Sequence, residues 1–151
     1  MRVPVRPVKG YSLSFAENPG PTPLGVAVLD DSLHAVVVPL ENGLRVAGTA
    51  EFTGFDLSPN EARIANLKRL LAQVLPEAKI DPGSGRPWCG LRPMASNGVP
   101  IIGRSPVPNL WIATGHGHLG WTMAAGTGEM IADLMSGASP AVDSAPYAYA
   151  R

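Results

Sequence analysis

The chain has 151 residues, of which 45% are hydrophobic and 16% are charged, and it contains 17 glycines and 16 prolines. This size and hydrophobic content allow one globular domain or pieces of two. Twelve Lys and Arg residues balance twelve Asp and Glu residues, so the chain carries no net positive field to hold phosphates, and a nucleic-acid partner is excluded.

The first fifty residues contain short apolar and β-branched runs broken by turn formers, a pattern that predicts strands. We expect four of them, at Val5–Phe15, Leu24–Leu29, His34–Leu40 and Leu44–Phe52. Asn42-Gly43, between the last two, is typical of a β-hairpin because both residues tolerate positive φ. Glu17–Pro23 is rich in proline, which cannot donate to a strand ladder, and is expected to be a surface loop. An antiparallel sheet is therefore predicted.

A helix is predicted over residues 59–75. Ser58 offers an N-cap hydroxyl, Pro59 suits the first helical position, and Glu61 follows as the third residue of a capping box. Apolar residues then recur at steps of three and four and form one stripe, at Ile64, Leu67, Leu70, Leu71 and Val74. Pro76 ends the helix. We expect this amphipathic helix to pack on the sheet, which gives an α+β fold.

The segment 81–108 is rich in proline and glycine and is expected to be extended or looped, with one short strand at 98–103. A buried strand is predicted at 110–114, followed by a helix from about Gly120 to Gly137, which suits the residue after a helix end. Two glycines inside that helix, Gly126 and Gly128, each cost about 1 kcal/mol relative to alanine. They predict a close contact that requires the absent side chains. The tail 138–151 lacks periodicity and is expected to be disordered.

The run Gly115-x-Gly117-x-x-Gly120 matches the dinucleotide fingerprint and lies between a strand and a helix. A complete dinucleotide fold also needs a second strand with an acidic residue about twenty positions further on. Because this chain has only a short tail there, a self-contained NAD or FAD fold is not expected. Two readings stay open: the free N–H groups at the helix start face a ligand, or the glycines only allow tight packing.

Arg92 is the strongest candidate for binding a substrate, because a guanidinium keeps its charge on burial and grips a carboxylate with two parallel hydrogen bonds. A solvated or structural arginine is the alternative. His116 and His118 lack the third and fourth ligands of a zinc site, so no metal is expected. Cys89 has no histidine near it in sequence and is expected to be a buried thiol rather than a nucleophile. No catalytic residue is therefore assigned.

The single cysteine also excludes a scaffold held by internal disulfides and favours a reducing compartment. The longest apolar runs fall well short of the roughly 20 residues that a membrane-spanning helix needs. The first residues do not have the uninterrupted apolar stretch of an export signal. We therefore expect a cytoplasmic protein, peripheral to a membrane at most.

Four sequence blocks together carry a resemblance to a known family. They are Pro7-Val8-Lys9-Gly10-Tyr11-Ser12, Arg45-Val46-Ala47-Gly48-Thr49-Ala50-Glu51-Phe52, Gly90-Leu91-Arg92-Pro93 and Thr114-Gly115-His116-Gly117-His118-Leu119-Gly120-Trp121-Thr122. In this order they resemble the C-terminal portion of the D-amino acid dehydrogenases, which belong to the FAD-dependent D-amino acid oxidase and glycine oxidase superfamily. The resemblance extends from Val5 to about Gly137.

The resemblance implies a domain division and a set of roles. Residues 1–108 would form the substrate-binding domain, 109–137 the last strand and helix of the FAD domain, and 138–151 a tail. The amino acid substrate would be bound by Arg92 and Tyr11. The cofactor FAD would be contacted by Lys9, Gly10 and the segment Gly115, His116, Gly117, His118, Leu119, Gly120, Trp121 and Thr122. A hydride would pass from the substrate α-carbon to the flavin, so no protein nucleophile is needed.

Members of this family begin with a glycine-rich phosphate loop that this chain does not contain. We therefore expect the chain to share its FAD with an N-terminal half or partner chain and not to hold FAD tightly alone. The alternatives are a silent substrate-binding or interaction module, one chain of a split enzyme, and a carboxylate-binding domain that uses Arg92 without flavin. The surface meant for the FAD domain would favour association into a dimer or larger species.

Overall fold

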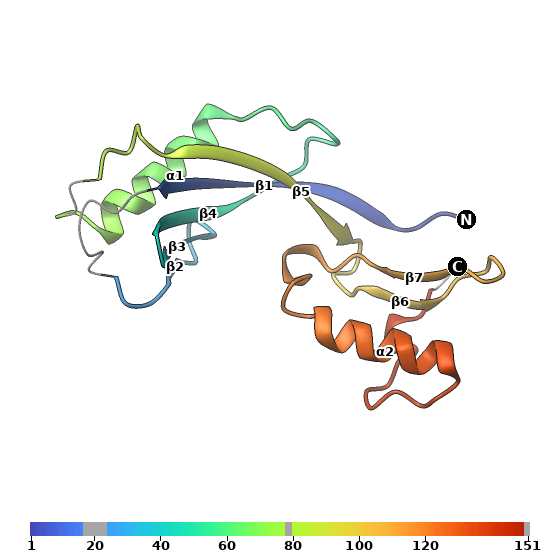
Figure 1. Ribbon diagram of the computed structural model, residues 1–151. Coiled ribbons are helices and arrows are strands. Elements are labelled where there is room, and N and C mark those ends of the chain that lie inside the picture. The colour runs from blue at the N-terminus through green and yellow to red at the C-terminus, as the bar shows by residue number, and fades with distance from the viewer. Residues whose placement is uncertain (17–23, 78–79, 150–151) are drawn as a thin grey trace. The chain divides into compact units, whose positions relative to one another are not determined.

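Five strands form the larger sheet, in the order β2-β3-β4-β1-β5 (Figure 1). Their bounds are Val5–Ala16 for β1, Val28–Asp30 for β2, Ala35–Leu40 for β3, Gly43–Glu51 for β4 and Arg86–Ala95 for β5. The pairs β1–β4, β3–β4 and β2–β3 are antiparallel. The computed structural model describes residues 1–16, 24–77 and 80–149, so the loop predicted at Glu17–Pro23 lies outside the described residues.

The chain divides into two compact units, one of Lys9–Leu91 and the other of Met1–Val8 with Arg92–Arg151. This division reflects contacts within the chain and does not indicate which unit binds a substrate or a cofactor. The assignment of 1–108 to a substrate-binding domain and of 109–137 to an FAD domain therefore stays a prediction.

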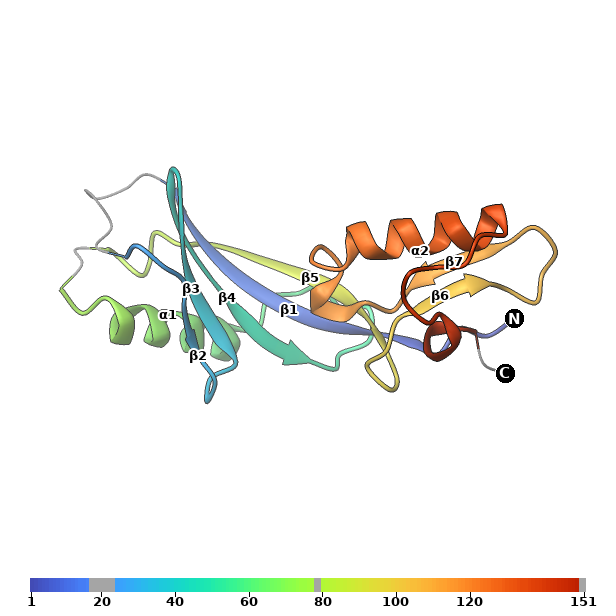
Figure 2. The same cartoon turned by 90° about the horizontal axis from the view of Figure 1, so that it is seen from below.

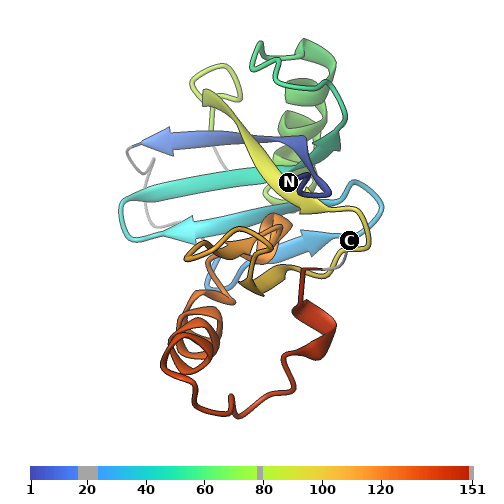
Figure 3. The ribbon, with the colours of Figure 1, turned by 90° about the vertical axis from the view of Figure 1, so that its right-hand side faces the viewer.

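The Lys9–Leu91 unit is built around helix α1, Glu61–Val74, which lies on one face of the strands (Figure 3). Alternate residues of β1, β3 and β4 point to that helix because side chains alternate along a strand. They meet the apolar stripe of the helix in one core, made of Tyr11, Leu13, Phe15, Ala35, Val37, Leu44, Val46, Ile64, Leu67, Leu70, Leu71 and Leu75. The predicted α+β fold with a packed amphipathic helix is confirmed.

The helix start predicted at Ser58 and Pro59 is wrong by two residues. Asn60 is the N-cap, and its side chain accepts a hydrogen bond from the Ala62 N–H. The Ser58 hydroxyl instead donates to Asp56, and the Ser58 carbonyl accepts from Lys9. Asp56 is a near neighbour in sequence, but Lys9 is 49 residues away, so the local pattern could not reveal its contact with Ser58.

Two strand predictions also need correction. The strand expected at Leu24–Leu29 begins only at Val28. Leu24 packs against the core, and Gly25 and Val26 form a bend between it and the strand. The segment 81–108, expected to be extended or looped with one short strand at 98–103, also contains β5, a strand of ten residues. Pro87 and Pro93 are tolerated in it because β5 is an edge strand, where a missing N–H leaves no inner ladder bond unmade.

The other unit contains the antiparallel pair β6, Ile101–Arg104, and β7, Trp111–Thr114, with helix α2, Ala124–Ser136, beside it (Figure 2). The buried apolar residues described in this unit are Val8, Ala95, Ile101, Ile102, Ile112 and Met130. Gly137 ends α2 in the left-handed region, as predicted. The tail contains a 3-10 turn at Ala145–Tyr147, and the Tyr149 hydroxyl donates to the Arg2 carbonyl.

Helix α2 differs from its prediction in two respects. It begins at Ala124 rather than near Gly120, because a 3-10 turn at Gly117–Leu119 comes first. Apart from the adjacent residues and the backbone of α2 itself, no described atom lies within 4 Å of the position that a Cβ would take at Gly126 or Gly128. The close contact predicted from these glycines is therefore not made by the part of the chain that the structure describes. Among those residues, no helix is long and apolar enough to cross a membrane.

Candidate functional site

The glycine-rich turn after β7 has a conformation that requires glycine. Gly115 has φ of 85° and Gly117 has φ of 59°, both in the left-handed region. A Cβ on Gly117 would also collide with the sulfur of Met94. Gly117 therefore packs closely against Met94, which agrees with the interpretation that these glycines allow tight packing. This packing leaves room for the other interpretation, a ligand at the residues that follow.

The start of α2 retains the positive end of its helix dipole. The residue at its N-cap, Met123, makes no side-chain capping bond, and the first turn contains no acidic residue. Trp121 and Thr122 just before it are exposed, Trp121 to 95%. His116 Nε2 lies 2.9 Å from Thr127 Oγ1 and ties the turn to the helix. This end of the helix suits an electron-rich group such as the edge of a flavin ring.

Arg92 is carried by the last part of β5, next to the same turn. Met94 forms an antiparallel β-bridge with His116, and the Ala95 N–H donates to the Gly115 carbonyl at 3.3 Å. Because side chains alternate along a strand, Arg92 shares a face with Met94. The guanidinium is half-buried, and burial lowers its pKa, although an arginine keeps its charge at neutral pH. The structure thus brings the strand end with Arg92 and the predicted cofactor segment into one unit.

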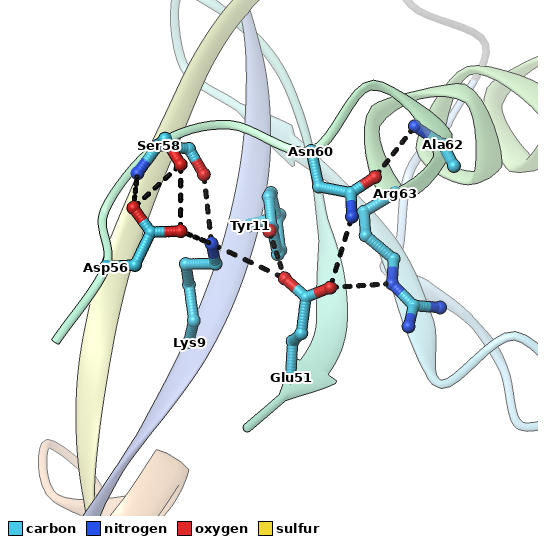
Figure 4. Close-up of polar contacts among 8 residues, drawn as sticks. All are labelled: Lys9, Tyr11, Glu51, Asp56, Ser58, Asn60, Ala62 and Arg63. Carbon is cyan, nitrogen blue, oxygen red and sulfur yellow. Dashed lines mark hydrogen bonds and ion pairs between the residues drawn. The ribbon is translucent and has the colours of Figure 1, made fainter. Parts of the chain in front are cut away.

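Lys9, Gly10 and Tyr11 belong to the other unit, where both long side chains have internal partners (Figure 4). The Lys9 ammonium group, in a residue that is 1% exposed, donates to the Ser58 carbonyl at 2.9 Å and to Asp56 Oδ2 at 3.3 Å. The Tyr11 hydroxyl donates to Glu51. The side chains predicted to meet cofactor and substrate therefore contact protein groups, and Gly10 between them offers only its backbone.

The charges of this cluster shift one another's pKa values. Burial alone would lower the pKa of Lys9, but its hydrogen bonds with Tyr11 and Asp56 raise it well above its ordinary value. Burial and the bond to Glu51 raise the pKa of Tyr11, and that same bond lowers the pKa of Glu51. Hydrogen bonds from Ser58 and Lys9 lower the pKa of Asp56 to about 2. At neutral pH the cluster therefore holds two carboxylates, an ammonium and a neutral phenol.

Sequence reasoning gave no role to Glu51 or Asp56. Glu51 lies in the block Arg45–Phe52, which resembles the family but by itself does not indicate which groups its carboxylate contacts.

Among the described residues, no group of three or more His, Cys, Asp or Glu side chains could hold a metal ion. Burial raises the pKa of Cys89, which favours the thiol over the thiolate that a nucleophile needs.

Comparison with known proteins identifies the family. The family model "FAD dependent oxidoreductase" matches residues 1–134. The chain is 44% identical over 152 residues to a D-amino acid dehydrogenase of Xanthobacter autotrophicus, covering all of this chain and 36% of that protein. It is 40% identical over 153 residues to an uncharacterised oxidoreductase of Halorhodospira halophila, covering all of this chain and 70% of the other.

The fold is similar to that of a solved glycine oxidase. The crystal structure of glycine oxidase from Geobacillus kaustophilus superimposes with a TM-score of 0.84 at 27% identity, covering all of this chain and 40% of that one. The resemblance inferred from the four sequence blocks is thereby confirmed. The chain spans about a third of the D-amino acid dehydrogenase that it matches.

Proposed function

This chain belongs to the family of FAD dependent oxidoreductases, and from that premise we propose that it supplies the substrate-binding part and one edge of the flavin site of an enzyme that oxidises D-amino acids. The substrate class comes from the name of the Xanthobacter relative. The observation that carries the proposal is the bridge between Met94 and His116, which joins the strand of Arg92 to the start of the glycine-rich turn.

In this proposal Arg92 binds the substrate carboxylate, as a half-buried cation does best. Tyr11 remains a proposed substrate contact, although its hydroxyl is bonded to Glu51. Gly115–Thr122 would hold the flavin ring, with the start of α2, which has no side-chain cap, directed to its electron-rich edge. The backbone of Lys9-Gly10 would line the same cofactor. FAD, when bound, supplies the acceptor for the hydride that leaves the α-carbon of the amino acid.

The chain's own residues would then act by binding and orientation. If Arg92 holds the carboxylate, one end of the amino acid is fixed. The hydrogen on the α-carbon would then face the flavin in one orientation. No protein nucleophile is required for this reaction class. The remaining part of the FAD site would be supplied by the region of the longer relatives that this chain does not span.

The test is an assay of the chain mixed with the N-terminal region of the Xanthobacter relative that precedes the matched segment. D-amino acid and FAD are added, and reduction of an artificial electron acceptor is measured. We expect Arg92→Ala to raise the KM for the amino acid about 10- to 100-fold, since a hydrogen bond to a charged group contributes roughly 1.5–3 kcal/mol. Arg104→Ala is the matched control, because Arg104 lies over the Trp111 ring, with its guanidinium carbon 5.6 Å from the ring centroid.

An unchanged KM in Arg92→Ala, with activity present in the mixture, would show that Arg92 does not bind the substrate. Absence of activity with calorimetric binding of D-amino acid to the chain alone would favour the silent binding module. Titration of the chain alone with FAD completes the test, and we expect weak binding there.

A further inference from the structure

Glu51 is the centre of a polar cluster that joins three elements of the Lys9–Leu91 unit (Figure 4). Its side chain is 12% exposed and accepts hydrogen bonds from the Tyr11 hydroxyl, from Asn60 Nδ2 at 3.3 Å and from Arg63 Nε at 3.3 Å. Lys9 Nζ lies 3.5 Å from the same carboxylate. One carboxylate therefore connects β1, the end of β4 and the start of α1.

A β-bulge in β4 gives Glu51 this direction. Tyr11 lies opposite Gly48 in the ladder, so a regular register would place Ala50 opposite Lys9. Instead Glu51 lies opposite Lys9, and the register shifts by one residue. A shift of one residue exchanges the two faces of a strand. Thr49, with φ of 67°, carries the backbone strain of this bulge.

Lys9 makes two hydrogen bonds and a further ion pair inside the cluster. An ammonium group has three N–H donors, and three oxygens surround this one: those of Ser58 at 2.9 Å, Asp56 at 3.3 Å and Glu51 at 3.5 Å. Its Nζ also lies 5.5 Å from the centroid of the Tyr11 ring. With two hydrogen bonds, an ion pair and 1% exposure, the Lys9 ammonium is directed to protein groups.

The two partners other than Glu51 lie on the segment 52–60, which connects β4 to α1 without a helix or strand of its own. Asp56 is further held by the Ser58 N–H at 2.9 Å and the Ser58 hydroxyl at 2.7 Å. Phe52 and Phe55 on this segment are 81% and 83% exposed. Apolar packing of these two side chains therefore does not hold the segment, whereas the contacts with Lys9 do.

We propose that Lys9, Glu51 and Asp56 form a charge clamp that positions the segment 52–60 and the backbone of Gly10, and that the Lys9 side chain serves this clamp rather than a cofactor. The positioning of the segment follows from the contacts alone. Its meaning for catalysis rests on the proposed function, since only there does Gly10 face the flavin. In that case all three are positioning residues, acting through the β1 backbone.

The first test is limited proteolysis of the full chain by chymotrypsin, which cleaves after exposed phenylalanines. In the wild type the clamp restrains the segment, so cleavage after Phe52 and Phe55 requires local opening. We expect Lys9→Met and Asp56→Asn to speed this cleavage on the order of tenfold. Lys68→Met, a lysine replacement on α1 outside the clamp, is expected to leave the rate unchanged.

Asp56→Asn decides the outcome if Lys9→Met fails to fold, because Asp56 is half-exposed and its removal leaves the core intact. Circular dichroism confirms the fold of each variant before digestion. A folded Asp56→Asn chain that is cleaved after Phe52 and Phe55 at the wild-type rate would overturn the proposal.

The second test measures how the charge of Glu51 affects the ionisation of the Tyr11 phenol. Glu51→Gln removes the negative charge that helps to raise the pKa of Tyr11, so the phenol should ionise at lower pH in ultraviolet titration. The wild-type chain, titrated in parallel, is the reference. An unchanged titration of Tyr11 would contradict the assignment of Glu51. Neither test contains flavin, so failure of the clamp is distinguishable from failure of the proposed function.

Discussion

A glycine of β4 and two glycines of α2, in different compact units, have opposite surroundings. In the Lys9–Leu91 unit, a Cβ on Gly48 would lie 2.7 Å from the Ala35 Cα and from the His34 carbonyl oxygen. In the other unit, no described atom outside the adjacent residues and the backbone of α2 lies within 4 Å of such a Cβ on Gly126 or Gly128. The close approach of Ala35 and His34 explains why residue 48 is a glycine. Gly126 and Gly128 lower the stability of α2, and no contact among the described residues requires them.

The same difference holds for the large apolar side chains. Those facing α1 form one continuous core in the Lys9–Leu91 unit, while the unit with α2 buries few of its own and leaves Trp121 exposed. A unit can therefore be folded and yet contain sequence features that its own contacts do not require. We expect the missing contacts in the longer relatives, of which this chain spans only part.

The largest effect is expected for a truncation in the continuous core. Leu67 is fully buried between α1 and the sheet, so Leu67→Ala should lower the free energy of unfolding by about 2–5 kcal/mol. Urea unfolding followed by circular dichroism measures it. Leu119→Ala, at a half-exposed position before α2, is the control. Equal losses in the two variants would remove the contrast between the units.

A smaller loss is expected at Gly48. A methyl group there meets backbone atoms of β3 and the preceding turn, which cannot move aside as a flexible side chain can. Gly48→Ala should therefore lower the free energy of unfolding by about 1–3 kcal/mol. Hydrogen exchange of β3 and β4 locates the change. If Gly48→Ala leaves stability intact, the close approach of the two strands is not what requires glycine there.

The same substitution in α2 should act in the opposite direction. Gly128→Ala adds a methyl group in open space on an exposed helix position, so it should raise the stability of the chain by up to about 1 kcal/mol. Thermal unfolding and hydrogen exchange of α2 provide the measurement. A destabilising Gly128→Ala would mean that this glycine already has a close neighbour in the isolated chain.

The smallest effect concerns acid stability of the Lys9–Leu91 unit. The pKa of Asp56 falls from 3.8 to about 2 on folding, so its contribution is complete above pH 3.8 and is lost as the pH falls towards 2. Asp56→Asn should weaken the fall in melting temperature between these pH values. The effect is modest because Asp56 is half-exposed and screened by solvent. An identical acid profile in the variant would contradict the pKa assignment.

Several elements could be predicted from the sequence because neighbouring residues determine them. The hairpin between β3 and β4 is predicted from Asn42-Gly43, although its two loop residues are Glu41 and Asn42 because Leu40 pairs with Gly43. The end of α2 follows from Gly137, and the buried face of α1 from its apolar period. Arg92 and the glycine-rich turn could likewise be selected, since their chemistry shows in the residues themselves. The family followed from the order of four such blocks and is confirmed.

Other features depend on which segments meet. β5 is a strand despite Pro87 and Pro93 because it occupies a sheet edge. Asn60 rather than Ser58 caps α1 because Asp56 and Lys9 already engage Ser58. Glu51 reaches Lys9 and Tyr11 only through a bulge in β4. Short-range propensity determines turns, caps and apolar periods, but the partner of a buried charge is chosen by the register of distant strands, which only the tertiary structure decided.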